Sequence, residues 1–84
     1  MLNDLKQNIL TQLIQQNYPP VLTQTHIKSI TGHSDSFIEQ ARLKGEFIPY
    51  VKIGRSVRYL MADVVEYLAG LKRLNSTAED TQEV

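Results

Sequence analysis

The sequence predicts a mainly α-helical domain that carries one small β-hairpin. Apolar residues recur at helical spacing in several segments, and Ser, Thr and Gly stand where these segments begin and end. One decamer, VKIGRSVRYL at 51–60, instead alternates apolar and polar residues around a Gly-Arg-Ser centre, as a hairpin does. A chain of 84 residues has room for one domain with a modest core.

The first helix is expected over residues 2–17. Its apolar residues follow the helical period and cover about half of the circumference. They are Leu2, Leu5, Ile9, Leu10, Leu13 and Ile14. Tyr18-Pro19-Pro20 ends this helix, because a residue before proline is pushed out of the helical region. The segment 1–18 either packs on the core of the domain, or pairs with a second copy or a partner protein.

Two short helices are expected next, with a tight turn between them. Thr23 is a suitable N-cap for QTHIKSIT, and Gly32 suits the left-handed conformation that ends this helix. Ser34 or Ser36 caps the third helix, where Ser36 and Glu39 fit a capping box. Two short helices joined by a tight turn that contains glycine predict a helix-turn-helix.

The hairpin at 51–60 follows Gly45, the residue that ends the third helix. Its register is expected to place apolar residues on one face and basic residues on the other. A two-residue Arg55-Ser56 turn is disfavoured, because it would mix the two faces. The expected register sets Val51 opposite Tyr59, Lys52 opposite Arg58 and Ile53 opposite Val57, with Gly54-Arg55-Ser56 as a three-residue loop.

The last helix is expected from about Ala62 to Leu74. Acidic residues in its first turns and basic residues in its last turn suit the helix dipole. Residues 75–84 show no apolar periodicity and are expected to form a disordered acidic tail. The predicted organisation is an N-terminal amphipathic helix at 1–18, a helix-turn-helix domain with a hairpin at 21–74, and the tail.

Positive charge is concentrated in the middle of a chain whose formal net charge is zero. Residues 23–60 hold six Lys and Arg against three Asp and Glu, which gives +3. Residues 61–84 hold two against five, which gives −3. The expected register opposes Lys52 and Arg58, and like charges opposite each other are destabilising unless a polyanion neutralises them. The middle of the chain therefore suits a nucleic-acid partner, bound with modest affinity.

Several other classes of protein are disfavoured. The chain has no cysteine, so neither a disulfide framework nor a thiolate metal site is expected. No apolar run approaches the roughly 20 residues that span a bilayer, and MLNDLKQNIL is not a signal peptide, so a soluble cytoplasmic protein is expected. His26 and His33 lack further ligands for a metal, and no catalytic constellation stands out. Neither an enzyme nor a cofactor is predicted.

Five motifs in a fixed order carry a resemblance to a known family. They are Leu22-Thr23, Gly32-His33-Ser34, Gly45-Glu46-Phe47 with Pro49 one place late, Gly54-Arg55-Ser56-Val57-Arg58-Tyr59, and Asp63-Val64-Val65-Glu66-Tyr67-Leu68. With this order and spacing, residues 22–68 resemble the excisionase and AlpA-type family of small MerR-like winged-helix DNA-binding proteins. The resemblance implies a winged helix-turn-helix fold, in which the third helix is the recognition helix and the hairpin is the wing.

The resemblance also implies a function and partners. Proteins of this type bind double-stranded DNA near the attachment sites of mobile genetic elements and help an integrase or recombinase to excise the element, or they regulate its transcription. They have no catalytic activity of their own, and homodimers or cooperative assembly on DNA are expected. Gln40 stands where the family has an arginine, beside Glu39, and His26 and Lys28 also depart from the pattern. These departures concern the target sequence rather than the fold.

The candidate DNA contacts lie on the third helix and on the hairpin. They are Ser36, Phe37, Gln40, Lys44, Lys52, Arg55, Ser56 and Arg58. Arg42 is a weaker candidate, because half of its helix must face inward. Phe37 either contacts a thymine methyl or packs in the core. Arg58 either contacts DNA or forms a salt bridge with a carboxylate such as Asp63. The cations of the hairpin could equally form a solvated face.

A function of another class fits the same sequence. The zero net charge, together with Gln40 and Glu39, is also typical of a protein-interaction module that kept a winged-helix shape. Such a module would dock its partner through the N-terminal helix rather than bind DNA.

Overall fold

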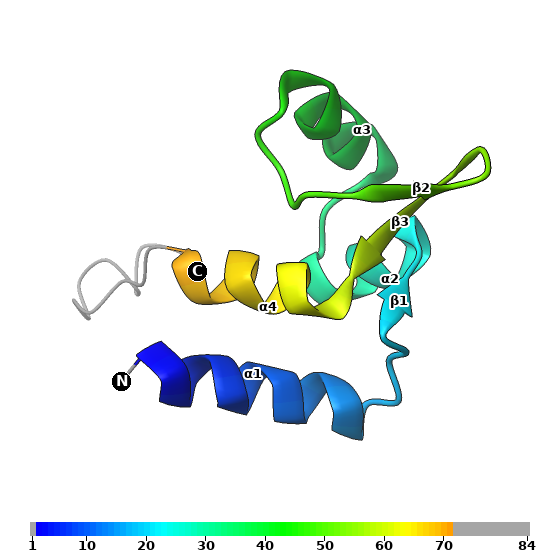
Figure 1. Ribbon diagram of the computed structural model, residues 1–84. Helices are drawn as coiled ribbons and strands as arrows, with labels where there is room; N and C mark the ends of the chain where they lie inside the picture. Colours follow the sequence, from blue (N-terminus) through cyan, green and yellow to red (C-terminus); the bar gives the residue numbers. More distant parts are fainter. Residues whose placement is uncertain (1, 72–84) are drawn as a thin grey trace.

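Four helices and three short antiparallel strands make up the part of the chain that the computed structural model describes, residues 2–71 (Figure 1). The predicted tail at 75–84 lies outside these residues. The elements are α1 (Leu2–Gln15), β1 (Val21–Leu22), α2 (Gln24–Thr31), α3 (Asp35–Lys44), β2 (Val51–Ile53), β3 (Ser56–Leu60) and α4 (Met61–Gly70). The mainly helical class with a small hairpin is confirmed, and the shape is compatible with a winged helix-turn-helix.

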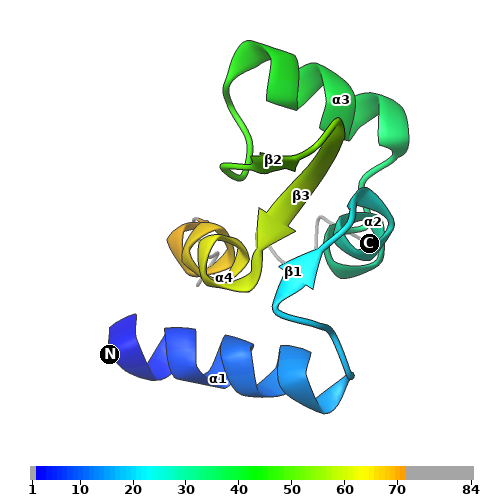
Figure 2. The same ribbon diagram turned by 45° about the vertical axis from the view of Figure 1, so that its right-hand side comes forward.

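The helices lie on two sides of the short sheet (Figures 1 and 2). Helices α1 and α4 lie side by side at one end of the molecule, while α3 lies beyond the β2–β3 hairpin at the other. Lys6 of α1 forms an ion pair with Glu66 of α4, with Nζ and Oε2 2.8 Å apart. The apolar face of α1 is therefore turned toward α4, and among the large apolar residues at 3–15 only Ile14 is strongly exposed, at 57%.

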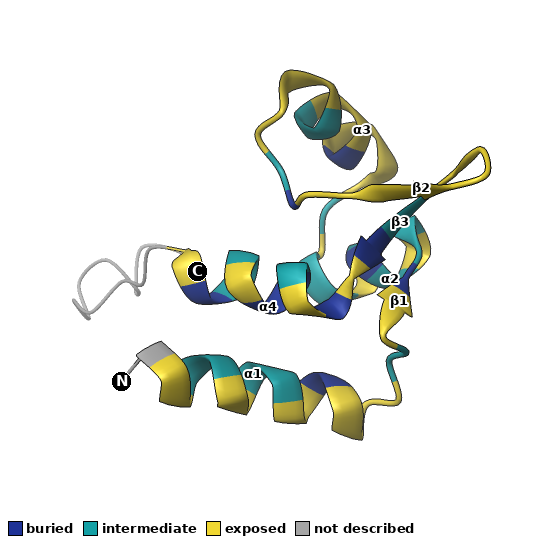
Figure 3. Ribbon diagram, in the orientation of Figure 1, coloured by how far each residue is buried: buried dark blue, intermediate teal, exposed yellow. Residues whose placement is uncertain are grey.

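The core lies where α2, α3, β3 and α4 meet (Figure 3). Its most deeply buried side chains are Leu22, Ile27, Ile38, Ile48, Tyr59 and Val64. Helix α1 adds Leu13, which is 6% exposed, and packs Ile9 and Leu10 against the same cluster. All three residues of β2, in contrast, are exposed. The hairpin is thus anchored through β3, and β2 forms its outer edge.

The ends of α2 and α3 follow from capping residues, as the sequence indicates. The Thr23 hydroxyl accepts a hydrogen bond from the His26 backbone N–H at 3.4 Å, and His26 Nδ1 accepts one from the Thr23 N–H at 3.0 Å. Gly32 ends α2 with φ +81°. Ser34 is the N-cap of α3, since its hydroxyl accepts from the Phe37 N–H at 3.1 Å. The alternative cap at Ser36 is wrong, because this residue already lies inside the helix.

The register of the hairpin differs from the prediction. The structure sets Val51 opposite Arg58, Lys52 opposite Val57 and Ile53 opposite Ser56, around a two-residue turn of Gly54 and Arg55. The turn sets the register of the two strands. Gly54 has φ +65°, and tight hairpin turns require a positive φ at their first central residue. Residues opposite each other share a face of the sheet. Lys52 and Arg58 therefore lie on opposite faces and do not oppose each other.

The sheet contains a strand that the sequence does not predict. Strand β1 pairs with β3, with Val21 opposite Leu60 and Leu22 opposite Tyr59, so the strand order is β1-β3-β2. A further hydrogen bond joins the Met61 N–H to the Pro20 carbonyl at 2.9 Å. A pair of residues is too short for a recognisable alternation, which is why the pattern of the sequence misses β1.

The last helix is shorter than predicted. Helix α4 begins at Met61, directly after β3, and ends at Gly70. Leu71 is extended, with φ −67° and ψ 141°, so the predicted continuation toward Leu74 is wrong at this residue; 72–74 lie outside the described residues. Within residues 2–71 no helix has both the length and the apolar character needed to cross a membrane.

Candidate nucleic-acid interface

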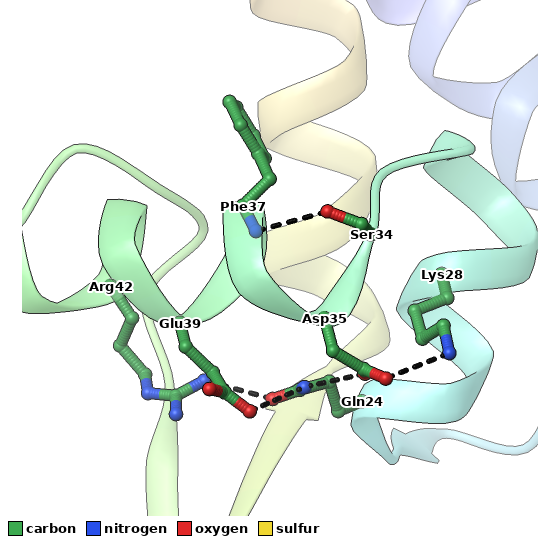
Figure 4. A network of polar contacts seen from close by, with 7 residues as sticks. All are labelled: Gln24, Lys28, Ser34, Asp35, Phe37, Glu39 and Arg42. Carbon is green, nitrogen blue, oxygen red and sulfur yellow. Dashed lines mark hydrogen bonds and ion pairs between the residues drawn. The ribbon is translucent and has the colours of Figure 1, made fainter.

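One side of α3 is held against α2 by a polar network (Figure 4). Asp35 and Glu39 are four residues apart and so lie on the same side of the helix. Gln24 Nε2 donates to Asp35 Oδ1 at 2.8 Å and to Glu39 Oε2 at 3.4 Å. Lys28 Nζ lies 2.9 Å from Asp35 Oδ2. The hydrogen bond from Gln24, together with Lys28, lowers the pKa of the Asp35 carboxyl below its ordinary value.

Arg42 lies on this same side, one turn further along, and is turned inward. Its Nη1 donates to Gln24 Oε1 at 3.0 Å and to the Tyr59 hydroxyl at 3.0 Å. Its guanidinium carbon lies 5.9 Å from the centroid of the Tyr50 ring. The side chain thus connects α2, α3 and β3, in keeping with the expectation that it is a weak candidate for DNA contact.

Another side of α3, opposite the buried Ile38 and the half-buried Ala41, faces solvent. Ser36, Gln40 and Leu43 recur at intervals of four and three residues, so they form one stripe along the helix. All three are exposed, and Leu43 is 85% exposed, the highest value among the large apolar residues of 3–71. Leu43 is absent from the predicted contacts. Its position seven residues after Ser36 is the signal that would have placed it on the same face.

Phe37 and Lys44 flank this stripe. The Phe37 ring stacks on His33, with centroids 3.9 Å apart and planes inclined by 28°, and it remains 47% exposed. It therefore lies outside the buried core, on the side of α3 away from Asp35 and Glu39 (Figure 4). A shallow hollow of about 140 Å³ opens beside it, lined by Phe37, Gln40, Ala41, Lys44 and Glu46.

The hairpin carries three cations without acidic partners among residues 2–71. Lys52, Arg55 and Ser56 are exposed, while Arg58 is half-buried and donates from Nη1 to the Val57 carbonyl at 2.9 Å. Neither ion pair between the described side chains involves the hairpin, so the alternative salt bridge from Arg58 to Asp63 does not form. In both ribbon views the hairpin projects next to α3, at the end of the molecule away from α1 (Figures 1 and 2).

The predicted contacts therefore fall into two groups. Ser36, Phe37, Gln40 and Lys44 lie on the exposed side of α3. Lys52, Arg55, Ser56 and Arg58 lie on the neighbouring hairpin, with Lys52 and Arg58 on opposite faces of it. The exposed side of α3 combines hydrogen-bonding, apolar and aromatic groups, and the hairpin supplies positive charge. Such a surface suits a nucleic acid, whose phosphates are negatively charged and whose base edges offer hydrogen-bonding groups and methyl groups.

Other parts of the described chain offer less chemistry. A cleft of about 370 Å³ between α1, α2 and α4 is lined by Ile9, Gln12, Leu13, Gln16, Ser29, Ile30 and Leu68, without a titratable group. No cluster of three or more His, Asp or Glu side chains suited to a metal occurs within residues 2–71. His26 acts in the cap of α2 and His33 stacks on Phe37, so each histidine has a local structural role.

No protein-family model matches the chain, and neither the curated proteins nor the solved structures include a significant match. The resemblance described above therefore depends on the motifs of the sequence alone.

Proposed function

We propose that this chain is a double-stranded DNA-binding accessory protein, either an excisionase-like factor or a small transcription regulator of a mobile genetic element. Helix α3 enters the major groove, and the β2–β3 hairpin contacts the phosphate backbone. The observation that carries the proposal is the hairpin, where Lys52, Arg55 and Arg58 have no acidic partner among the described residues. They lie next to a helix that exposes Ser36, Gln40 and Leu43.

The size of α3 and the charge of the β2–β3 hairpin support this placement on DNA. The major groove of B-DNA, about 12 Å wide, admits an α-helix. Helix α3 has 10 residues, a length of about 15 Å, and exposes one side to solvent. Each phosphate that Lys or Arg neutralises releases bound counterions, which favours binding at low salt. Three hairpin cations on a chain of zero net charge fit a protein of modest affinity that acts beside another DNA-binding protein, such as an integrase.

The rival function has less support. A protein-interaction module that docks through α1 would need a free apolar face on this helix. In the structure that face packs on α4 and on the core, and Leu13 is buried. The exposed side of α1 is almost entirely polar. Helix α1 is therefore better explained as an enlargement of the core.

An electrophoretic shift assay over a range of salt concentrations tests the proposal, with duplexes from attachment regions and promoters. We expect binding that weakens steeply as salt rises. Arg55→Ala should weaken binding to every duplex and reduce the salt slope by about one unit. Lys6→Ala is the matched control, because it removes one positive charge from α1, far from the hairpin. The proposal is wrong if no duplex shows salt-sensitive binding, or if both variants behave alike.

A further inference from the structure

The outermost stripe of α3 carries no charge. Ser36, Gln40 and Leu43 are all exposed there. The acidic residues of the helix, Asp35 and Glu39, are instead hydrogen-bonded to Gln24 of α2 on another side. The stripe therefore presents a hydroxyl, an amide and an isobutyl group, and the exposed cation of α3, Lys44, lies beside it, one turn after Gln40.

This set of groups is selective among base pairs. In the major groove, guanine is read mainly by Arg or Lys, which donate to O6 and N7, and cytosine is read by a carboxylate. The three residues of the stripe include neither, because Arg42 is bonded to Tyr59 and Gln24, and Glu39 is turned toward α2. Lys44 is exposed but lies at the last residue of α3, beside the stripe. A glutamine amide pairs with N6 and N7 of adenine, and an apolar side chain contacts the methyl group of thymine. Each group of the stripe thus has a partner on an A·T pair.

The apolar surface of Leu43 stays in water in the free protein and would leave water in such a contact. At 85% exposure its side chain gains almost nothing from folding, since apolar surface is stabilised only when it leaves water. Gln40 and Leu43 are three residues apart, a rise of about 4.5 Å along an α-helix. Successive base pairs are separated by about 3.4 Å. The two side chains are therefore spaced to reach neighbouring base pairs.

We infer that α3 selects A·T base pairs in the major groove, with Gln40 reading an adenine and Leu43 contacting a thymine methyl on an adjacent pair. The inference rests on the proposed function and adds to it the sequence class of the DNA. Phe37 and Lys44, which flank the stripe, are left for contacts with the sugar-phosphate backbone.

The experiment begins with the full chain and a pool of randomised 20-base-pair duplexes, from which bound sequences are selected. We expect the selected sites to share a short A·T segment. A selected duplex is then compared with a version that has uracil in place of thymine, which lacks only the methyl group. Wild type should lose about fourfold in affinity, the value of one buried methyl group. Leu43→Ala should lose a similar factor on the thymine duplex and show no further loss on the uracil duplex.

A second substitution in the DNA tests Gln40. Replacing adenine by 7-deazaadenine removes the N7 acceptor, and wild type should then lose at least about fivefold in affinity. Gln40→Ala should be insensitive to this change. Glu46→Ala, at an exposed residue just past the end of α3, is the control and should retain both sensitivities. Thermal melts check folding, which Leu43→Ala should leave intact because the side chain is exposed.

The outcomes separate the inference from the proposed function. If binding is salt-sensitive but the thymine and uracil duplexes bind equally, or if G·C segments are selected, the A·T inference is wrong and the proposed function stands. If Leu43→Ala retains the full sensitivity to uracil, the assigned contact is wrong. If no duplex is bound in a salt-sensitive manner, the proposed function fails and the inference fails with it.

Discussion

The Arg42 guanidinium of α3 donates a hydrogen bond to the Tyr59 hydroxyl of β3 at 3.0 Å. Tyr59 is fully buried, and its ring lies in edge contact with Phe47, with centroids 6.1 Å apart. The same nitrogen of Arg42 also donates to Gln24 of α2. One side chain thus fixes α3 relative to both β3 and α2, and so sets the spacing of the two halves of the proposed DNA surface.

Loss of this connection should lower stability. Arg42→Met keeps an unbranched side chain but removes both hydrogen bonds, which leaves the Tyr59 hydroxyl without its donor. We expect the free energy of unfolding, measured by urea titration, to fall by about 1–3 kcal/mol. Lys44→Met on the same helix is the control and should change it by less than about 0.5 kcal/mol, because Lys44 is exposed. Equal losses in both variants would show that the hydrogen bonds of Arg42 contribute nothing.

The N-cap of α2 should also contribute measurably to the stability of the fold. Thr23→Ala removes the hydroxyl that accepts from the His26 N–H, and we expect a loss of about 1 kcal/mol in the free energy of unfolding. Thr25→Ala, two residues further and exposed, should be neutral or slightly stabilising, because alanine favours the helix interior. A Thr23→Ser variant that recovers most of the loss would identify the hydroxyl as the cause, and its failure to do so would exclude the cap.

The turn of the hairpin should depend on glycine. Gly54 has φ +65°, and a Cβ added there would meet no atom within 4 Å. Any cost of Gly54→Ala therefore comes from backbone conformation, and we expect a loss of about 1–2 kcal/mol in thermal or urea unfolding. Gly54→Asn should lose less, because asparagine adopts positive φ more readily than alanine does. If both substitutions were neutral, the turn would have another conformation.

Asp35 should make stability depend on pH. Because its pKa is lowered in the folded protein from an ordinary value of 3.8, its contribution to stability is complete above pH 3.8 and is lost as the pH falls through the lower, folded-state value. Asp35→Asn should therefore reduce the melting temperature slightly at neutral pH, and the difference from wild type should shrink in acid. Glu46→Gln, at an exposed residue without an ion pair, should show no such narrowing. A constant difference at all pH values would contradict the assignment.

Short-range chemistry made the helical part of the fold predictable. Thr23, Gly32 and Gly45 act through their own backbone and their immediate neighbours, so their roles could be read directly from the sequence. The strand pairing was harder, because the prediction placed Val51 and Ile53 toward the core. In the structure both are exposed, at 36% and 58%. A tight turn at Gly54 outweighs the burial of these two side chains.

In the candidate site, too, some positions could be predicted from the sequence and others could not. The exposed positions of Gln40 and Lys44 follow from helical periodicity, whereas Arg42 and Leu43 required the tertiary structure. Arg42 is turned inward by partners on two other elements, which no local pattern records. Leu43 is a leucine that lies outside the core, contrary to what its residue type suggests. Burial and long-range hydrogen bonds are properties of the assembled fold, and they decided both cases.

The pairing of Val21 with Leu60 has a consequence for the order of folding. The hairpin turn and the caps of α2 and α3 join residues that are close in sequence. These parts can therefore form as soon as they are synthesised. The β1–β3 pair instead closes a loop of about 40 residues, and α1 must wait for α4. A chain emerging from the ribosome would therefore hold α1 without its partner until nearly all of the described residues had been made. Arg42 and Tyr59, which hold the two halves of the proposed DNA surface together, would both be synthesised before α4 is complete.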